Sequence, residues 1–215
     1  MTENWHQNFK SKNREALIAA AKELCMKQSF LNVNIKDVCS AAGISRVTFY
    51  KHFQSMDELI LAIQVEILES MTGYVKNAVS TEMSGKEMLA SMLEAWVNYA
   101  STHLGYIKFV LLFDLHYEAY DSGQQLKEQY NLFINREKEQ HFLLDALQTG
   151  YMDGTLRSEP DPLNTAHFIF VSMMSMLQKM SLASEEDQVT IQSDLRFAKR
   201  FVEMLVQHLS NERMA

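Results

Sequence analysis

The chain has 215 residues, of which 47% are hydrophobic and 22% are charged, and its formal net charge is −7. These values are ordinary for a folded protein and exclude an intrinsically disordered chain. No apolar run reaches the roughly 18 to 20 residues that a membrane-spanning helix needs, and the first residues lack the apolar segment of a secretory signal. We therefore expect a cytoplasmic protein that does not enter a membrane.

Cys25 and Cys39 are the only cysteines of the chain. Two cysteines in a chain of this length do not indicate a disulfide framework, and they favour a reducing compartment. We expect each thiol to serve as a small buried hydrophobic group, with a redox sensor as the open alternative.

Positive charge is concentrated at the N-terminal end. Residues 1–56 hold eight Lys and Arg against four Asp and Glu, a net charge of +4, whereas residues 57–215 hold twelve against twenty-three, a net charge of −11. The basic part is suited to bind a polyanion, while the acidic remainder keeps the rest of the molecule away from other polyanions.

Helical periodicity and capping signals account for most of the chain. Glycine and proline are sparse, and the segments between them carry apolar residues at three- and four-residue steps, beginning with residues 14–30. No segment shows the sustained alternation of a strand. The sequence predicts an all-α protein with three short N-terminal helices and then five or six longer ones. The expected caps are Asn34 with Asp37, Gly43, Ser45, Ser55 with Glu58, Ser84 with Glu87, and Asp161 with Pro162.

Residues 34–53 have the pattern of two short helices joined by a turn that contains Gly43. In the second helix Phe49 and Phe53 lie one turn apart and are expected to face the core. The opposite side is polar and basic, which suits the phosphates and base edges of a DNA major groove. From periodicity alone, an ordinary solvated helix remains an equal alternative. The residues on the outward side and at the helix start are Ser45, Arg46, Val47, Thr48, Tyr50, Lys51 and His52.

From REALIAAAKELC through NIKDVCSAAGISRVTFYKHFQSMDELILAI, about residues 14–63, the sequence resembles the DNA-binding domain of the TetR/AcrR family of bacterial transcriptional regulators. The resemblance includes the Ala-Gly turn, the Thr-aromatic-Tyr-x-His-Phe core and the Ser-x-x-Glu-Leu start of the next helix. It implies a helix-turn-helix DNA-binding domain over residues 1–55 and a helical effector-binding and dimerisation domain over residues 56–215.

Three positions depart from the family pattern. Ser29 stands where the family usually has Gly, Met56 replaces a common Lys that contacts phosphate, and Lys51 replaces a common aromatic residue. The operator sequence therefore cannot be taken over from a relative, although the predicted DNA-binding function is unaffected.

The resemblance also implies a homodimeric repressor that binds an inverted-repeat operator in double-stranded DNA and leaves it when a small effector binds. It makes the seven outward residues above operator contacts and Asn34 a phosphate contact. A DNA-binding architectural or division-linked protein on the same scaffold, without a small-molecule switch, is the alternative.

Two apolar segments near the C-terminus, residues 165–180 and 194–209, occupy the place of the helices through which the family dimerises. Their alternative role is intramolecular core. The residues predicted for the interface are Phe170, Met173, Met174, Leu177, Phe197, Phe201, Met204 and Leu205.

Aromatic and methionine side chains are frequent between residues 74 and 142, which suits a pocket for an apolar or aromatic small molecule. The candidates for its wall are Trp96, Tyr99, Phe113 and His116, and each of them alone could equally be plain core.

An enzyme is the alternative from another class. In DLHYEAYD, residues 114–121, a site would need His116 to join the carboxylates of Asp114 and Glu118. Residues two apart do not share a helical face, so the spacing opposes such a site. The sequence also lacks the His-Glu-x-x-His, phosphate-loop and Gly-x-Ser-x-Gly motifs. We predict no catalytic residues, no metal site and no cofactor.

Overall fold

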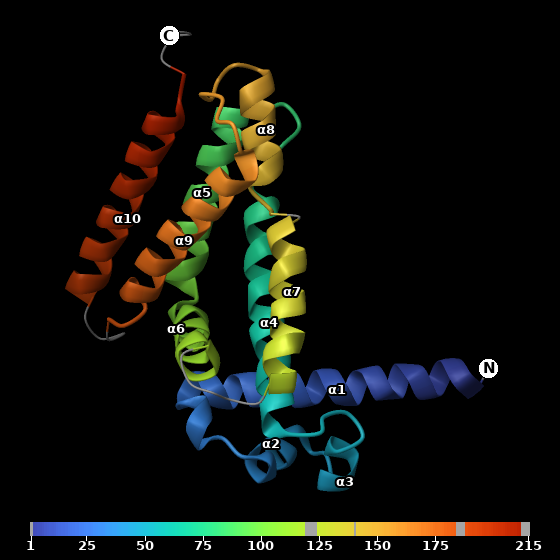
Figure 1. The fold of residues 1–215 in the computed structure, drawn as a ribbon. Helices are drawn as coiled ribbons and strands as arrows, with labels where there is room; N and C mark the ends of the chain where they lie inside the picture. The colour runs from blue at the N-terminus through green and yellow to red at the C-terminus, as the bar shows by residue number, and fades with distance from the viewer. Residues whose placement is uncertain (1, 119–123, 140, 184–187, 212–215) are drawn as a thin grey trace. The chain divides into compact units, whose positions relative to one another are not determined.

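The computed structural model describes residues 2–118, 124–139, 141–183 and 188–211, and these are helical apart from the connecting loops and one isolated antiparallel bridge between Leu156 and Ser210 (Figure 1). The prediction of an all-α protein is confirmed. The elements are α1 Thr2–Lys27, the 3-10 helix η1 Phe30–Asn32, α2 Ile35–Ala42, α3 Arg46–Phe49, α4 Met56–Lys76, α5 Gly85–Thr102, α6 Leu104–Phe113, the π-helix η2 Asp114–Glu118, α7 Gln124–Glu139, α8 Leu144–Met152, α9 Pro162–Met180 and α10 Gln188–Leu209.

The expected number and lengths of the helices were wrong in two respects. Helix α1 has 26 residues and is not short, and the described residues after α3 form seven α-helices instead of five or six. One unforeseen break separates α5 from α6 at His103, whose φ of −132° and ψ of 45° leave the helical region. Gly105, two residues after His103, is the local signal in the sequence that marks this break.

The expected caps were largely correct. Asn34, Ser45 and Asp161 each cap a helix through the side chain, and Ser84 forms a full capping box with Glu87. These contacts satisfy backbone N–H groups that the first turn of a helix leaves unpaired. Local sequence therefore predicts where α2, α3, α5 and α9 begin.

The chain divides into two compact units, each described here by itself. Unit 1 comprises Met1–Ile67 and Leu112–Tyr130, and unit 2 comprises Leu68–Leu111 and Asn131–Ala215. In unit 1 the side chains of Leu17, Val38 and Leu59 are fully buried and form part of a core between α1, α2 and the start of α4. Among the described residues no helix is both long and apolar enough to cross a membrane.

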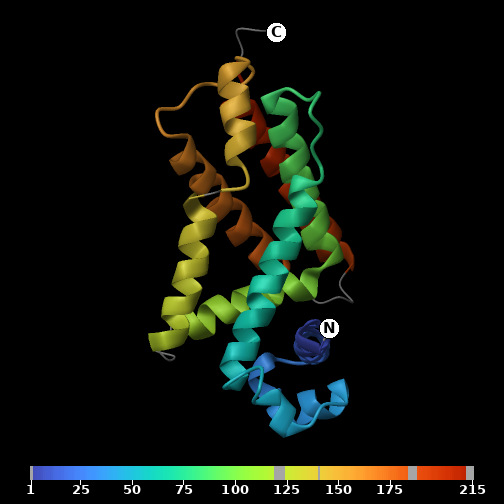
Figure 2. The same ribbon diagram turned by 90° about the vertical axis from the view of Figure 1, so that its right-hand side faces the viewer.

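In unit 2, α8 packs against α5 through two glycines (Figure 2). A Cβ atom added to Gly85 would overlap the backbone of Gly150. The backbone N–H of Gly85 also donates to the carboxylate of Asp153 at 2.8 Å, so the residue after α8 closes the N-terminus of α5. Helix α10 lies beside α9 and α5, and its end is joined to the segment after α8 by the backbone bond from Arg157 N–H to Leu209 C=O at 2.7 Å.

We expect Gly85→Ala to destabilise the protein by about 1 to 3 kcal/mol or more, because the added methyl group meets backbone that cannot rotate away. Gly73→Ala is the matched control, since a Cβ at this position in α4 has no neighbour within 4 Å. Alanine is the better helix former, so the control should stabilise the protein by up to about 1 kcal/mol. Chemical unfolding of both variants measures the difference, and equal stability of the two would contradict the close approach of α5 and α8.

Candidate nucleic-acid interface

The turn between α2 and α3 is fixed by backbone geometry. Gly43 adopts the left-handed conformation with φ of 65° and ψ of 28°, which costs glycine little. The N–H groups of Gly43 and Ile44 then donate to the carbonyls of Ser40 and Cys39 at 3.3 and 3.0 Å. The chain is thereby redirected within two residues, as a helix-turn-helix requires.

Helix α3 is a single turn that hydrogen bonds extend at both ends. The Ser45 hydroxyl accepts from the N–H of Thr48 at 3.1 Å, and beyond Phe49 the N–H groups of Tyr50 and Phe53 donate to the carbonyls of Arg46 and Phe49. Ordered backbone thus continues to Phe53, although the regular helix ends four residues earlier.

The prediction that Phe49 and Phe53 face the core is confirmed, because they are 0% and 2% exposed. Their ring centroids lie 5.8 Å apart, and the guanidinium of Arg14 in α1 lies 5.2 Å from the centre of the Phe53 ring. This anchor fixes how α3 is rotated about its axis. Val47 and Tyr50 consequently point outward, with exposed fractions of 72% and 58%.

The other predicted contact residues lie on or beside this outward face. Ser45, Arg46, Lys51 and Asn34 are exposed, and Thr48 and His52 are partly exposed. The Tyr50 ring meets the buried Phe49 ring edge-on at 5.4 Å, and the Tyr50 side chain remains more than half exposed. The structure shows that these residues are accessible, and their contact with DNA stays a prediction.

A concavity of about 590 Å³ lies between the start of α2 and α3 and brings together Asn34, Arg46 and Tyr50. Lys36 also lines it and was not among the predicted contacts. Asn34 is already engaged with Asp37: its amide oxygen accepts from the backbone N–H at 3.1 Å and its amide nitrogen donates to the carboxylate at 2.7 Å. Lys36 is therefore the stronger candidate for a phosphate contact at this position. A basic side chain in the first turn of α2 was the sequence signal that could have identified it.

Both cysteine thiols are free and buried. Burial raises the pKa of Cys25 to about 12 and also raises the pKa of Cys39. Since the thiolate is the reactive form, this environment favours the role of small buried hydrophobic groups.

The four predicted pocket residues fall in both units. In unit 2, Trp96 and Tyr99 are 0% and 2% exposed, and the indole N–H of Trp96 donates to the Met71 sulfur at 3.0 Å. In unit 1, Phe113 is fully buried, and the ring of His116 lies edge-on to Phe30 at 5.8 Å. An effector site that uses all four of them stays a prediction.

The predicted interface residues are in different environments. Met173 and Leu177 are 0% exposed within unit 2, an environment typical of intramolecular core, and their place at an interface stays a prediction. The Phe170 ring packs 5.4 Å from Trp96 and is directed toward the interior. Met174 and Leu205 are buried, Phe201 is partly exposed, and Phe197 and Met204 are 67% and 55% exposed.

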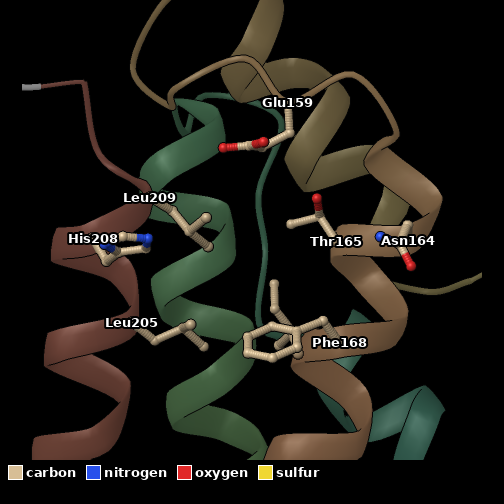
Figure 3. Close-up of a pocket in the computed structure, with 8 residues that line it drawn as sticks. Glu159, Asn164, Thr165, Phe168, Leu205, His208 and Leu209 are labelled. Carbon is tan, nitrogen blue, oxygen red and sulfur yellow. The ribbon is translucent and has the colours of Figure 1, made fainter.

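Helices α9 and α10 leave a groove of about 270 Å³ between them (Figure 3). Phe168 of α9 and Leu205 of α10 project into it from opposite sides, and His208 and Glu159 lie at its polar end. Phe168 and Val171, which are three residues apart on one face of α9, are 64% and 62% exposed. Of the exposed apolar side chains on α9 and α10, Phe197 and Met204 were predicted from the sequence, whereas Phe168 and Val171 were not.

Comparison with known proteins agrees with the helix-turn-helix geometry. Residues 17–63 match the family described as "Bacterial regulatory proteins, tetR family". An uncharacterised HTH-type transcriptional regulator of Haemophilus influenzae is 27% identical over 47% of this chain, and the match spans 50% of that relative. The transcriptional repressor KstR2 of Mycolicibacterium smegmatis is 23% identical over 69% of each chain.

The fold extends beyond the matched domain. The crystal structure of a TetR-family transcriptional regulator of Pectobacterium atrosepticum superposes with a TM-score of 0.71 over 95% of this chain and 97% of its own, at 16% identity. The fold and the site define a helical protein with an N-terminal helix-turn-helix. Residues 17–63 thus match the DNA-binding-domain model of the tetR family, and the chain as a whole shares its fold with a solved TetR-family regulator.

We expect Phe49→Ala to lower the free energy of unfolding by about 3 to 5 kcal/mol, because a fully buried aromatic side chain is truncated. Val47→Ala, two residues earlier on the outward face, should change it by less than about 0.5 kcal/mol. Urea unfolding of the two variants compares the opposite faces of one helical turn. Comparable losses would mean that the rotation of α3 is assigned wrongly.

Proposed function

We propose that the protein is a DNA-binding transcriptional regulator that acts as a homodimer on an inverted-repeat operator and releases it when a small effector binds. The observation that supports this most directly is the division of residues 46–53 between buried Phe49 and Phe53 and exposed Val47, Tyr50 and Lys51. Such a regulator acts in the cytoplasm, where its operator DNA lies. Among the relatives, KstR2 is a repressor and FasR of Mycolicibacterium smegmatis is an activator, and repression is proposed from the family resemblance.

In the proposed complex the outward face of α3 enters the major groove. Arg46, Lys51 and His52 would bind phosphates or guanine edges, Thr48 and Tyr50 would hydrogen-bond to phosphates, and Val47 would contact a thymine methyl group. Lys36 and Asn34 at the start of α2 would face the backbone across the concavity that they share with Arg46. The positive charge of residues 1–56 supplies the attraction for the duplex.

Dimerisation is proposed through the exposed apolar surface of α9 and α10. Phe168 and Val171 on α9 and Phe197 and Met204 on α10 are each more than half exposed, which is costly for a monomer in water. A two-fold axis on this surface would give two identical reading heads, and an inverted repeat requires such a pair. Phe197 and Met204 are also predicted for the interface from the sequence, whereas Phe168 and Val171 are included because of their exposure.

Selection of bound fragments from a random DNA pool at moderate salt should enrich an inverted repeat whose half-sites lie about one helical turn or slightly more apart. Tyr50→Ala and Lys51→Ala should lose selectivity for the repeat and keep nearly unchanged thermal stability, because both side chains are exposed. Lys36→Ala should weaken binding to all DNA sequences alike. It should also reduce the slope of log affinity against log salt concentration by about one.

Enrichment of no sequence by the folded protein would contradict a sequence-specific regulator. Uniform, salt-dependent binding without selectivity would instead support the architectural or division-linked alternative.

Phe197→Glu should convert the dimer into a monomer at micromolar concentrations, since it places a charge on the proposed apolar interface. Met152→Glu is the matched control, because Met152 is 82% exposed at the end of α8, away from the proposed surface. Sedimentation equilibrium measures both variants, and a Phe197→Glu protein that remains dimeric would exclude this surface.

A further inference from the structure

Four aromatic side chains of unit 2 gather around the imidazole of His141, and we call the five rings together the His141 box. The His141 ring stacks on Phe142 with centroids 4.8 Å apart and a 19° interplanar angle, and it meets His167 and Phe170 edge-on at 5.4 and 5.6 Å. Trp96 closes the box at 5.3 Å from Phe142 and 5.4 Å from Phe170. The members come from α5, from the start of the segment before α8, and from α9.

The hydrogen bonding of His141 determines where its proton lies. The backbone N–H of Leu143 donates to Nδ1 at 3.2 Å, so Nδ1 is an acceptor and the proton of the neutral ring is on Nε2. Burial, and to a smaller extent His167, lowers the pKa of His141 to about 4, which keeps the ring neutral near pH 7. Nε2–H is therefore a directed hydrogen-bond donor.

This donor is buried without an acceptor. His141 is 6% exposed, and among the described residues no group forms a hydrogen bond with its Nε2. A buried donor without an acceptor is unfavourable, and native structures rarely keep one. An oxygen atom that reached Nε2 would remove that penalty, so the box favours a molecule with a hydrogen-bond acceptor over an otherwise identical molecule without one.

The five rings differ in their exposure. Trp96 is fully buried and His141 is 6% exposed, whereas Phe142, His167 and Phe170 are partly exposed. Flat aromatic walls suit a flat apolar body, which can stack on them or meet them edge-on. No lysine or arginine is among the five described residues of the box, so the box itself offers no counterion to a carboxylate.

We infer that the His141 box binds an uncharged, flat, apolar molecule that carries a carbonyl oxygen, with His141 Nε2–H as the donor to that oxygen. The inference rests on the proposed function in one respect only: it identifies this molecule with the effector that controls DNA binding. It assigns to Trp96, one of the predicted pocket residues, the role of an apolar wall, and it adds four residues that were not predicted for the pocket.

The test uses fluorenone and fluorene, which are both flat and differ in one carbonyl oxygen. Equilibrium dialysis of the full chain, below the solubility limit of each compound, should give fluorenone an affinity about tenfold or more above that of fluorene. A site that only buried apolar surface would prefer fluorene, the more apolar of the two. In ¹⁵N-labelled protein the Nε2–H signal of His141 should shift with fluorenone and not with fluorene.

His141→Phe keeps a ring of similar shape without the N–H group and should abolish the preference for fluorenone. His208→Phe is the matched control, since it makes the same change at an exposed position in the groove between α9 and α10 and should retain the preference. Thermal melting shows that each variant is folded, and should His141→Phe fail to fold, the wild-type affinities and the Nε2–H signal decide alone.

Equal affinities in the wild-type protein, failure of both compounds to bind, or an undiminished preference in His141→Phe would each overturn the inference. The regulatory link is measured separately, on a DNA fragment enriched from the random pool. Fluorenone that binds with the expected preference but leaves DNA affinity unchanged would preserve the ligand site and overturn its identification as the effector site. Failure of the protein to select DNA concerns the proposed function and leaves the ligand measurement intact.

Discussion

The burial of Phe49 is the contact on which the proposed DNA-reading surface depends. Helix α3 has only four residues, so its own hydrogen bonds cannot hold it in a fixed orientation, and isolated helices of this length are not stable. The Phe49 ring, together with Phe53, fixes the rotation of the turn against α1 and α2. Every outward side chain takes its direction from this anchor, because neighbouring residues on a helix are offset by a constant angle.

The sequence predicted this part of the molecule well because its determinants are local. The caps at Asn34 and Ser45 act within three residues, and the left-handed turn at Gly43 is a property of one residue. The opposite exposure of Phe49 and Tyr50 follows from helical geometry once the helix is located. The family resemblance over residues 14–63 includes all of these local features, and the family match over residues 17–63 covers nearly the same segment.

The sequence predicted much less where contacts join distant segments. Gly85 and Gly150 are 65 positions apart, and nothing in either neighbourhood indicates that the two backbones meet. Residues 112–130 group with the N-terminal helices, through contacts such as the hydrogen bond from the Tyr117 hydroxyl to Asp57 at 2.7 Å. The boundary at residue 55 is predicted from the local motif, which carries no information about such contacts, and it stays a prediction.

Phe170 and Phe197 show why apolar composition alone does not assign a surface. Both were predicted for the dimer interface because both lie on apolar C-terminal helices, yet one packs on Trp96 and the other is 67% exposed. An apolar stripe is equally suited to the core of its own chain and to a partner, and only the placement of the neighbouring helices distinguishes the two. Helix α9 carries both kinds of surface: Met173 and Phe170 face its own unit, and Phe168 and Val171 face away from it. The His141 box and the proposed dimer surface therefore lie on different faces of α9, so a molecule bound in the box would contact the same helix that the partner contacts.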